Sequence, residues 1–198
     1  MTRAEDVDPS HTAVLLMDCQ PTVLAGYGPE DDAGYISALR SVREAGTRAG
    51  YRVIHVVTAF RAGHPEVAPS NARFAGVREA GMLVENTPGT EIHPMLAPVQ
   101  GELVVTKRRI SAFAGSDLDM LLRAQGITTL VLAGVSTSGV VLSTTRAAAD
   151  LNYRLVVLRD GCYDPDTSVH NMLMDSVFPA QAQVIDIRTW LQIVETNR

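Results

Sequence analysis

The chain has 198 residues, which is enough for one sizeable domain and short for two. Its 17 basic and 22 acidic residues give a net charge of −5, which argues against non-specific nucleic-acid binding because that activity needs a basic surface. The apolar runs are all shorter than the roughly 18 residues that cross a bilayer, so we expect no membrane partner.

Short apolar runs alternate with amphipathic stretches along the chain. In chain order the sequence predicts a strand over 13–18, a helix over 35–50, strands over 52–60 and 102–107, a helix over 116–126, a strand over 128–135, a helix over 142–152, a strand over 153–160, a helix over 166–178, a strand over 182–187 and a terminal helix over 189–197. Continuous apolar strands that alternate with helices indicate a parallel sheet covered on both faces. We therefore expect an α/β fold, a three-layer α/β/α domain built on a doubly wound, six-stranded, Rossmann-like sheet.

Residues 61–101 break this alternation, because they are rich in proline and glycine and have weak periodicity. We expect a long excursion there, with a short helix over 70–81, and long connections of this kind often act as lids or as arms that contact partners. The rest fits a single domain over 1–198, with residues 1–10 flexible.

The N-terminal stretch MTRAEDVDPSHT is polar and has no apolar signal core. The two cysteines, Cys19 and Cys162, lie in no metal-ligand spacing. We expect a cytoplasmic protein with reduced thiols.

Residues at the predicted strand ends are the first candidates for chemistry, because ligands of such sheets bind outside the carboxyl ends of the strands. The first strand ends in Asp18, the third in Lys107 and the fifth in Asp160, and the fourth runs into the glycine-punctuated turn GVSTSGV, residues 134–140. An acid and a lysine that emerge from adjacent strands could meet in one crevice and take part in proton transfer. A structural explanation stays open as well, since an aspartate can cap a turn and a lysine at a strand end is usually solvated.

Three blocks together resemble the isochorismatase-like hydrolase superfamily, also called the cysteine hydrolases, along nearly the whole chain. The blocks are LLMDCQ, VVTKRRISAFAGSDLDMLL and LVLAGVSTSGVVLSTTRAAADLNY. In the amidase branches of that family an Asp, a Lys and a Cys form the catalytic set, and the nucleophile turn carries a non-proline cis peptide. The resemblance implies that Asp18 and Lys107 are catalytic, that the cis bond falls at Val135–Ser136, and that the chain forms a homodimer or homotetramer.

The resemblance also places Val140 at the position of the family's nucleophilic cysteine. Valine cannot attack a carbonyl, so thiol-ester chemistry at this position is excluded. The turn would then serve as a substrate cradle, with a pocket and an oxyanion hole formed by Val135, Ser136, Gly139 and Val140, together with Gln20, Arg61 and Phe113. Arg61 is the candidate for binding a substrate carboxylate with two hydrogen bonds, and the alternative is a solvated or structural arginine.

Metal and cofactor binding are not expected. Metal-binding relatives keep an Asp-x-His after the second strand, whereas TAFRAGH offers only His64. The partner is therefore expected to be a small-molecule substrate alone.

Three mechanisms remain open. Asp18 could protonate a vinyl ether while water completes C–O cleavage, or it could act as a base for water that hydrolyses an amide, imide or ester, with N–H groups near Gly139 and Val140 stabilising the oxyanion. A substitute nucleophile, Ser136, Ser138 or Cys19, is a variant of the second. In the third, the chain is a catalytically silent binding or scaffold protein. The substrate itself cannot be deduced from the fold.

Overall fold

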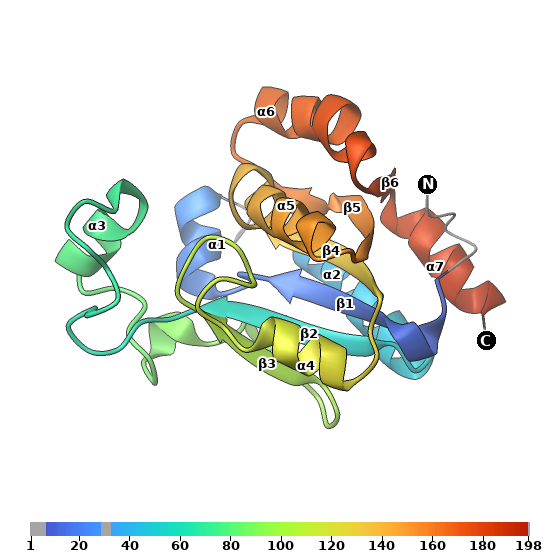
Figure 1. Cartoon of the computed structure of the whole chain (residues 1–198), viewed down its shortest axis with the longest axis horizontal. Helices are drawn as coiled ribbons and strands as arrows, with labels where there is room; N and C mark the ends of the chain where they lie inside the picture. Colours follow the sequence, from blue (N-terminus) through green and yellow to red (C-terminus); the bar gives the residue numbers. More distant parts are fainter. Residues whose placement is uncertain (1–6, 29–32, 198) are drawn as a thin grey trace.

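A computed structural model describes residues 7–28 and 33–197 and contains one parallel six-stranded sheet in the order β3-β2-β1-β4-β5-β6 (Figure 1). The fold class predicted from the sequence is confirmed. Each strand lies within or close to a predicted apolar run. The strands are β1 (Thr12–Met17), β2 (Arg52–Thr58), β3 (Leu103–Lys107), β4 (Thr129–Val135), β5 (Arg154–Tyr163) and β6 (Gln183–Ile185).

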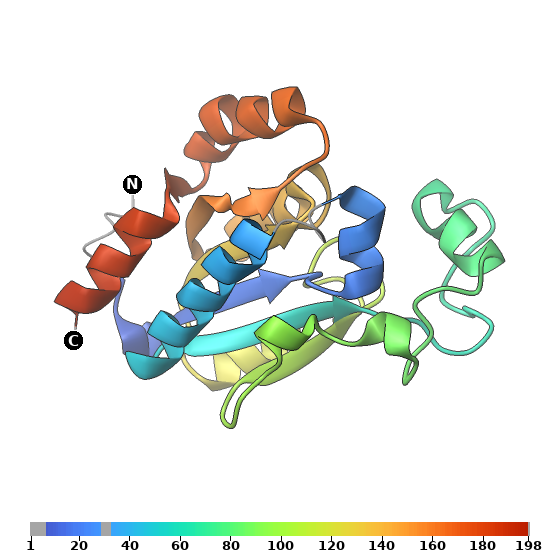
Figure 2. The same ribbon diagram turned by 180° about the vertical axis from the view of Figure 1, so that it is seen from behind.

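Helices cover both faces of the sheet. Helices α4 and α5 lie on the face towards the viewer in Figure 1, and the long α2, with α7, lies on the face seen in Figure 2. The helices are α1 (Pro21–Tyr27), α2 (Ala33–Arg48), α3 (Ala72–Glu79), α4 (Leu118–Ala124), α5 (Leu142–Asp150), α6 (Thr167–Met172) and α7 (Ile187–Thr196). One π-helical turn, Thr137–Val141, precedes α5 and another, Leu173–Val177, follows α6.

Helix α1 was not predicted from the sequence. Pro21 stands at its first position, where the missing N–H costs nothing. Gly28 ends it with a φ of 94°, and its N–H donates to the Leu24 carbonyl. This short helix follows β1 directly and forms one side of the cavity described below.

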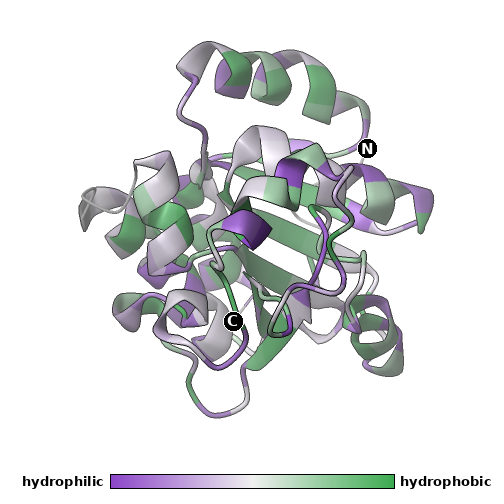
Figure 3. Ribbon diagram, turned by 90° about the vertical axis from the view of Figure 1, so that its left-hand side faces the viewer, coloured by the Kyte–Doolittle hydropathy of each residue, from purple (hydrophilic) through white to green (hydrophobic). Residues whose placement is uncertain are grey.

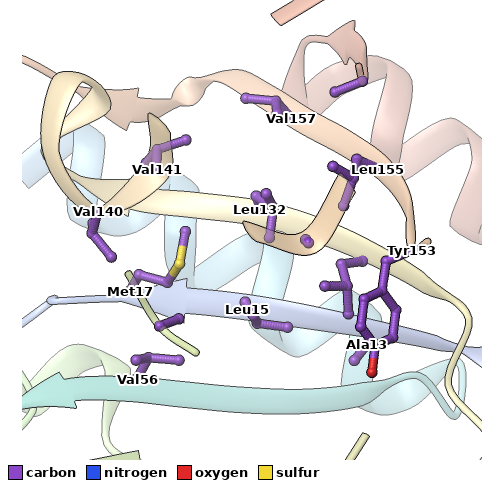
Figure 4. Close-up of a cluster of buried hydrophobic side chains, with 14 of the residues drawn as sticks. Ala13, Leu15, Met17, Val56, Leu132, Val140, Val141, Tyr153, Leu155 and Val157 are labelled. Carbon is purple, nitrogen blue, oxygen red and sulfur yellow. The ribbon is translucent and has the colours of Figure 1, made fainter. Parts of the chain in front are cut away.

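The core is split by the sheet into two apolar layers. Along β1, Leu15 and Met17 face the layer under α4 and α5, whereas Val14 and Leu16 face the layer under α2 and α7. Because successive side chains of a strand point to opposite faces, a strand buried on both sides must be apolar throughout. Figure 3 shows this as strands coloured hydrophobic between helices of mixed character, and Figure 4 shows side chains of the first layer.

Strand β5 continues to Tyr163, three residues beyond the end predicted at Asp160. The pairing of β4 with β5 shifts register between Leu132 and Gly134, and the irregularity accommodates the extra length. Asp160 therefore lies inside a strand and not at its end. Its carboxylate accepts the N–H of Ile187 at 2.7 Å and so helps to start α7.

Residues 61–101 run outside the sheet, and α3 stands away from it in Figure 1, within the range where a short helix was predicted. Backbone bonds of 2.8 Å from Phe60 to Leu83 and from Glu85 to Phe60 close the base of an arm, residues 61–84. A small apolar cluster of Phe60, Val67, Phe74 and Leu83 holds it together.

At the N-terminus, residues 1–6 of the stretch predicted to be flexible lie outside the described residues. Val7 is buried, and its carbonyl accepts the hydroxyl of Tyr51 at 3.1 Å and the amide of Asn197 at 2.8 Å. Within the ranges described, no helix is both long and apolar enough to span a membrane.

Candidate active site

The candidate site lies where three strands end side by side. Asp18 follows β1, Thr58 ends β2 and Lys107 ends β3. The sequence suggested that the acid and the lysine come from adjacent strands, but β2 lies between them. Thr58, which pairs in register with Lys107, occupies that gap. It was missed because a threonine at a strand end carries no signal of its own.

The three side chains form a closed hydrogen-bonded set. The Lys107 ammonium lies 2.9 Å from Asp18 Oδ2 and donates to Thr58 Oγ1 at 2.6 Å and to the Arg109 carbonyl at 3.1 Å. The Thr58 hydroxyl donates in turn to Asp18 Oδ1 at 2.9 Å. Lys107 has three protons and three acceptors, so its ammonium is satisfied although only 2% of the residue is exposed.

The backbone at Asp18 is unusual and is held from two sides. Its φ is 57°, in the left-handed region that aspartate and asparagine enter more readily than most residues. Its N–H donates to the Val56 carbonyl at 2.8 Å, so the residue is fixed to β2. This conformation turns the chain at the end of β1 while the carboxylate meets Lys107.

Gln20 is a positioning residue. It was predicted in the pocket, but it is fully buried and does not line the cavity. Its side-chain amide pairs with the backbone of Thr58 like a strand neighbour, accepting at 2.7 Å and donating at 3.0 Å, and it donates to the Thr90 carbonyl at 3.2 Å. Gln20 thus fixes the end of β2 and ties it to the loop around Thr90.

The turn after β4 is built around Gly134, whose φ is 143°. A Cβ on this glycine would lie 2.2 Å from the Met17 carbonyl oxygen, so only glycine lets β4 approach β1 here. The cis peptide expected at Val135–Ser136 is present.

Two residues support this turn from outside, and neither was recognised from the sequence. The carboxylate of Asp164 accepts the Ser138 N–H at 2.8 Å, and His170 Nδ1 lies 2.9 Å from the Thr137 hydroxyl. Burial lowers the pKa of His170, with a contribution from Arg159. Gly139, predicted at the pocket, does not line the cavity, and its N–H donates to the Ser136 carbonyl at 3.2 Å.

A cavity of about 440 Å³ opens above the strand ends, within the usual size range of small-molecule sites. Its polar floor consists of Asp18, Thr58, Lys107 and Ser136, so the predicted catalytic pair and the turn do meet in one place. The remaining lining comes from Val135, Val140, Ile110 and Pro165, from Thr22, Val23, Gly26 and Tyr27 in α1, and from Arg73, Phe74, Val77, Met82 and Leu83 in the arm.

Val140 lies in the wall of the cavity and in the core layer beneath it, and is 3% exposed. Figure 4 shows that it and Val141 point in different directions from the turn. Val141 is fully buried and does not line the cavity. The predicted nucleophile position therefore faces the cavity but carries no nucleophilic atom.

Two predicted pocket residues lie elsewhere. Arg61 does not line the cavity, because its guanidinium pairs with Glu66 at 2.5 Å, and its side chain is 62% exposed. Phe113 packs against Tyr153, with ring centroids 5.8 Å apart. The gripping role predicted for Arg61 is therefore not supported by its position.

Among the substitute nucleophiles, Cys19 is the least suitable. Burial raises the pKa of its thiol to about 12, and the charge of Asp18 adds to the shift. Burial also raises the pKa of the Cys162 thiol. Both cysteines are free and buried. Ser138 does not line the cavity, which leaves Ser136 as the one of the three that does.

His64 is buried, and its Nε2 lies 2.7 Å from the Met82 carbonyl, which links the two ends of the arm. In the described part of the chain, no three or more His, Cys, Asp and Glu side chains gather in a group that could hold a metal ion.

Comparison with known proteins agrees with this fold. The sequence model of the isochorismatase domain family matches residues 12–189 of this chain. The uncharacterized isochorismatase family protein YwoC of Bacillus subtilis is 29% identical over 90% of this chain and 92% of its own. Ureidoacrylate amidohydrolase RutB of Rhizobium rhizogenes is 31% identical over 78% of this chain and 71% of its own. A cysteine hydrolase from Pseudomonas syringae pv. phaseolicola has a similar fold, with a TM-score of 0.87 at 20% identity over 97% of this chain and 96% of that one.

Proposed function

The chain belongs to the isochorismatase family of hydrolases, and from this premise we propose that it hydrolyses the amide bond of a small molecule by direct attack of water. One observation carries the proposal. A buried carboxylate–ammonium pair, Asp18 and Lys107, forms the floor of a cavity whose predicted nucleophile position is the apolar Val140.

Asp18 is proposed as the general base. The Lys107 ammonium lies 2.9 Å from Asp18 Oδ2, and the Thr58 hydroxyl donates to Oδ1 of the same carboxylate, so the carboxylate is held in place at the floor of the cavity. From there it can accept a proton from water as the water attacks the carbonyl carbon. The proton then passes to the leaving nitrogen as the C–N bond breaks, so a carboxylic acid and an amine are released.

The turn after β4 is proposed to stabilise the oxyanion. Val140 lines the cavity, and its backbone N–H is the assigned donor, because the N–H of Ser138 is bound to Asp164 and that of Gly139 to Ser136. The sequence predicted that N–H groups near Gly139 and Val140 form the oxyanion hole, and the proposal now names the N–H of Val140 alone. Lys107 would offset the charge that develops at the floor.

Cleavage of a vinyl ether is the second candidate, because the apolar side chain of Val140 suits a reaction that needs no enzyme nucleophile. In that reaction Asp18 would deliver a proton to carbon while water completes the C–O cleavage. Amide hydrolysis is preferred because the relatives of this chain include the ureidoacrylate amidohydrolase RutB.

The test is a screen of purified protein against amides, imides, esters and vinyl ethers, repeated with two matched variants. Asp18→Asn should lower kcat/KM by about 100-fold or more. Asp160→Asn, the same change at a carboxylate that binds the Ile187 N–H, should leave it unchanged. Equal turnover by Asp18→Asn would refute the proposed site, and binding without turnover of any compound would favour the silent binding protein.

A further inference from the structure

Arg73 occupies a position on the cavity that the proposed chemistry does not use. It comes from α3, lines the cavity and is exposed, so it lies at a part of the lining that meets solvent, here called the mouth. Its guanidinium donates to the hydroxyl of Tyr27 in α1 and lies 5.7 Å from the centre of that ring. The contact joins the arm to the body of the protein across the mouth of the cavity.

The other arginines near the site are already paired. Arg61 binds Glu66, and Arg108 binds both Glu66 and Glu85. Arg109 donates to the carbonyls of Arg108 and Glu66. For Arg73, no carboxylate among the residues placed by the structure lies within ion-pair distance of the guanidinium. Four of its five N–H donors are not used by Tyr27.

We propose that the substrate carries a carboxylate, bound by Arg73 and the Tyr27 hydroxyl at the cavity mouth, with an apolar body between this carboxylate and the scissile amide. The inference rests on the proposed amide hydrolysis and adds its substrate class. Guanidinium groups bind carboxylates with two parallel hydrogen bonds, and the phenol can donate a third.

Apart from Thr22, the lining residues outside the polar floor and the Arg73–Tyr27 contact are apolar, which defines the body of the substrate. They include Val23, Phe74, Val77, Met82, Leu83 and Ile110. A polar chain in this region would lose its bonds to water without replacement, whereas an aliphatic or aromatic body would gain from burial.

The charge of the site favours a carboxylate over a phosphate. Among the described lining residues the cations are Arg73 and Lys107, and Lys107 already has three acceptors. One guanidinium can neutralise a single negative charge but not a phosphate dianion.

The experiment uses the monoamides of linear dicarboxylic acids from succinic to suberic acid. The straight-chain primary amide of equal length is the neutral partner of each. Dissociation constants are measured by titration calorimetry on Asp18→Asn protein, whose folding is checked by circular dichroism, and kcat/KM is measured on protein with Asp18 intact. Arg73→Gln is compared with Arg78→Gln, which removes the same charge from the same helix at a residue that does not line the cavity.

For at least one chain length the monoamide should bind on the order of tenfold more tightly than its neutral partner. This preference should vanish in Arg73→Gln and persist in Arg78→Gln. As a check that needs no change at Arg73, raising the salt from about 50 to about 500 mM should weaken binding of the monoamide to the Asp18→Asn protein, but not of the neutral amide.

Equal binding of both members of every pair, or a preference that survives Arg73→Gln, would overturn the inference, even if hydrolysis that depends on Asp18 is found. A preference that Arg73→Gln removes, without any hydrolysis, would support the carboxylate site while the proposed reaction fails. The two ideas can thus fail separately.

Discussion

The buried pair of Asp18 and Lys107 makes a prediction about stability that does not depend on knowing the substrate. We consider Asp18→Asn, Lys107→Met and the double variant. Asparagine tolerates the φ of 57° at position 18, and methionine keeps most of the lysine stem, so each change removes charge with little change in shape.

The magnitude follows from the contacts. Each single change leaves one charge buried without its partner, and breaking such a pair costs about 3–5 kcal/mol. We expect about 3 kcal/mol for each single variant, the low end, because the cavity admits water to the carboxylate. The double variant buries no charge. It loses the lysine's hydrogen bonds to Thr58 and to the Arg109 carbonyl, each worth about 1 kcal/mol, and should cost about 2 kcal/mol in total rather than about 6.

The assay is urea unfolding of the four proteins, with the coupling energy taken from the cycle. A loss of about 3 kcal/mol corresponds to a fall in Tm of about 6–12 °C for a chain of this length. The exposed pair Arg40–Glu44, at 2.7 Å on α2, is the control and should show a coupling of about 0.3–0.5 kcal/mol. A coupling energy at Asp18 and Lys107 no larger than this control would show that the two charges do not depend on each other.

Three further predictions concern other parts of the molecule. Gly134→Ala should lower the free energy of unfolding by at least about 3 kcal/mol, because the new Cβ would meet the Met17 carbonyl oxygen. Gly76→Ala, at an α3 glycine with open space around it, should cause no such loss. Equal urea midpoints for the two variants would contradict this prediction. Burial lowers the pKa of His55, so the unfolded chain takes up a proton that the folded chain resists, and stability should fall as the pH drops below about 6.5. His55→Gln, which keeps an N–H donor for Glu102, should make the urea midpoint less sensitive between about pH 7 and pH 5.5, and an unchanged sensitivity would exclude His55 as the source. Light scattering should show a homodimer or homotetramer, and a monomer at all protein concentrations would contradict this prediction.

Most of the framework could be predicted from the sequence, because strands buried on both faces must be apolar along their whole length. This is why the runs around Leu15 and Leu130 were recognised as strands. Asp18 and Lys107 were found because they end such runs. Thr58 was not found, because its role depends on β2 lying between β1 and β3. No local sequence pattern determines the order of the strands in a sheet.

The arginines illustrate the same limit. Arg61 and Arg73 both lie in the proline-rich and glycine-rich excursion, and nothing in their immediate sequence separates them. The folded arm places Glu66 beside Arg61 and turns α3 so that Arg73 reaches the cavity.

The contact between Asp164 and Ser138 is a further example. The two residues are 26 positions apart in the sequence, and their contact exists only once β4 and β5 have paired.

The central claim is that water, activated by Asp18, breaks the bond without a covalent intermediate. The most direct measurement is intact-protein mass spectrometry of enzyme quenched during turnover of the amide found in the screen. Wild type, Val140→Cys and the control Val141→Cys, whose side chain is buried away from the cavity, are compared. We predict an acyl adduct on Val140→Cys alone. An adduct on the wild-type protein, mapped to Ser136, Ser138 or Cys19, would show that the chain has a nucleophile of its own and would contradict the proposed mechanism.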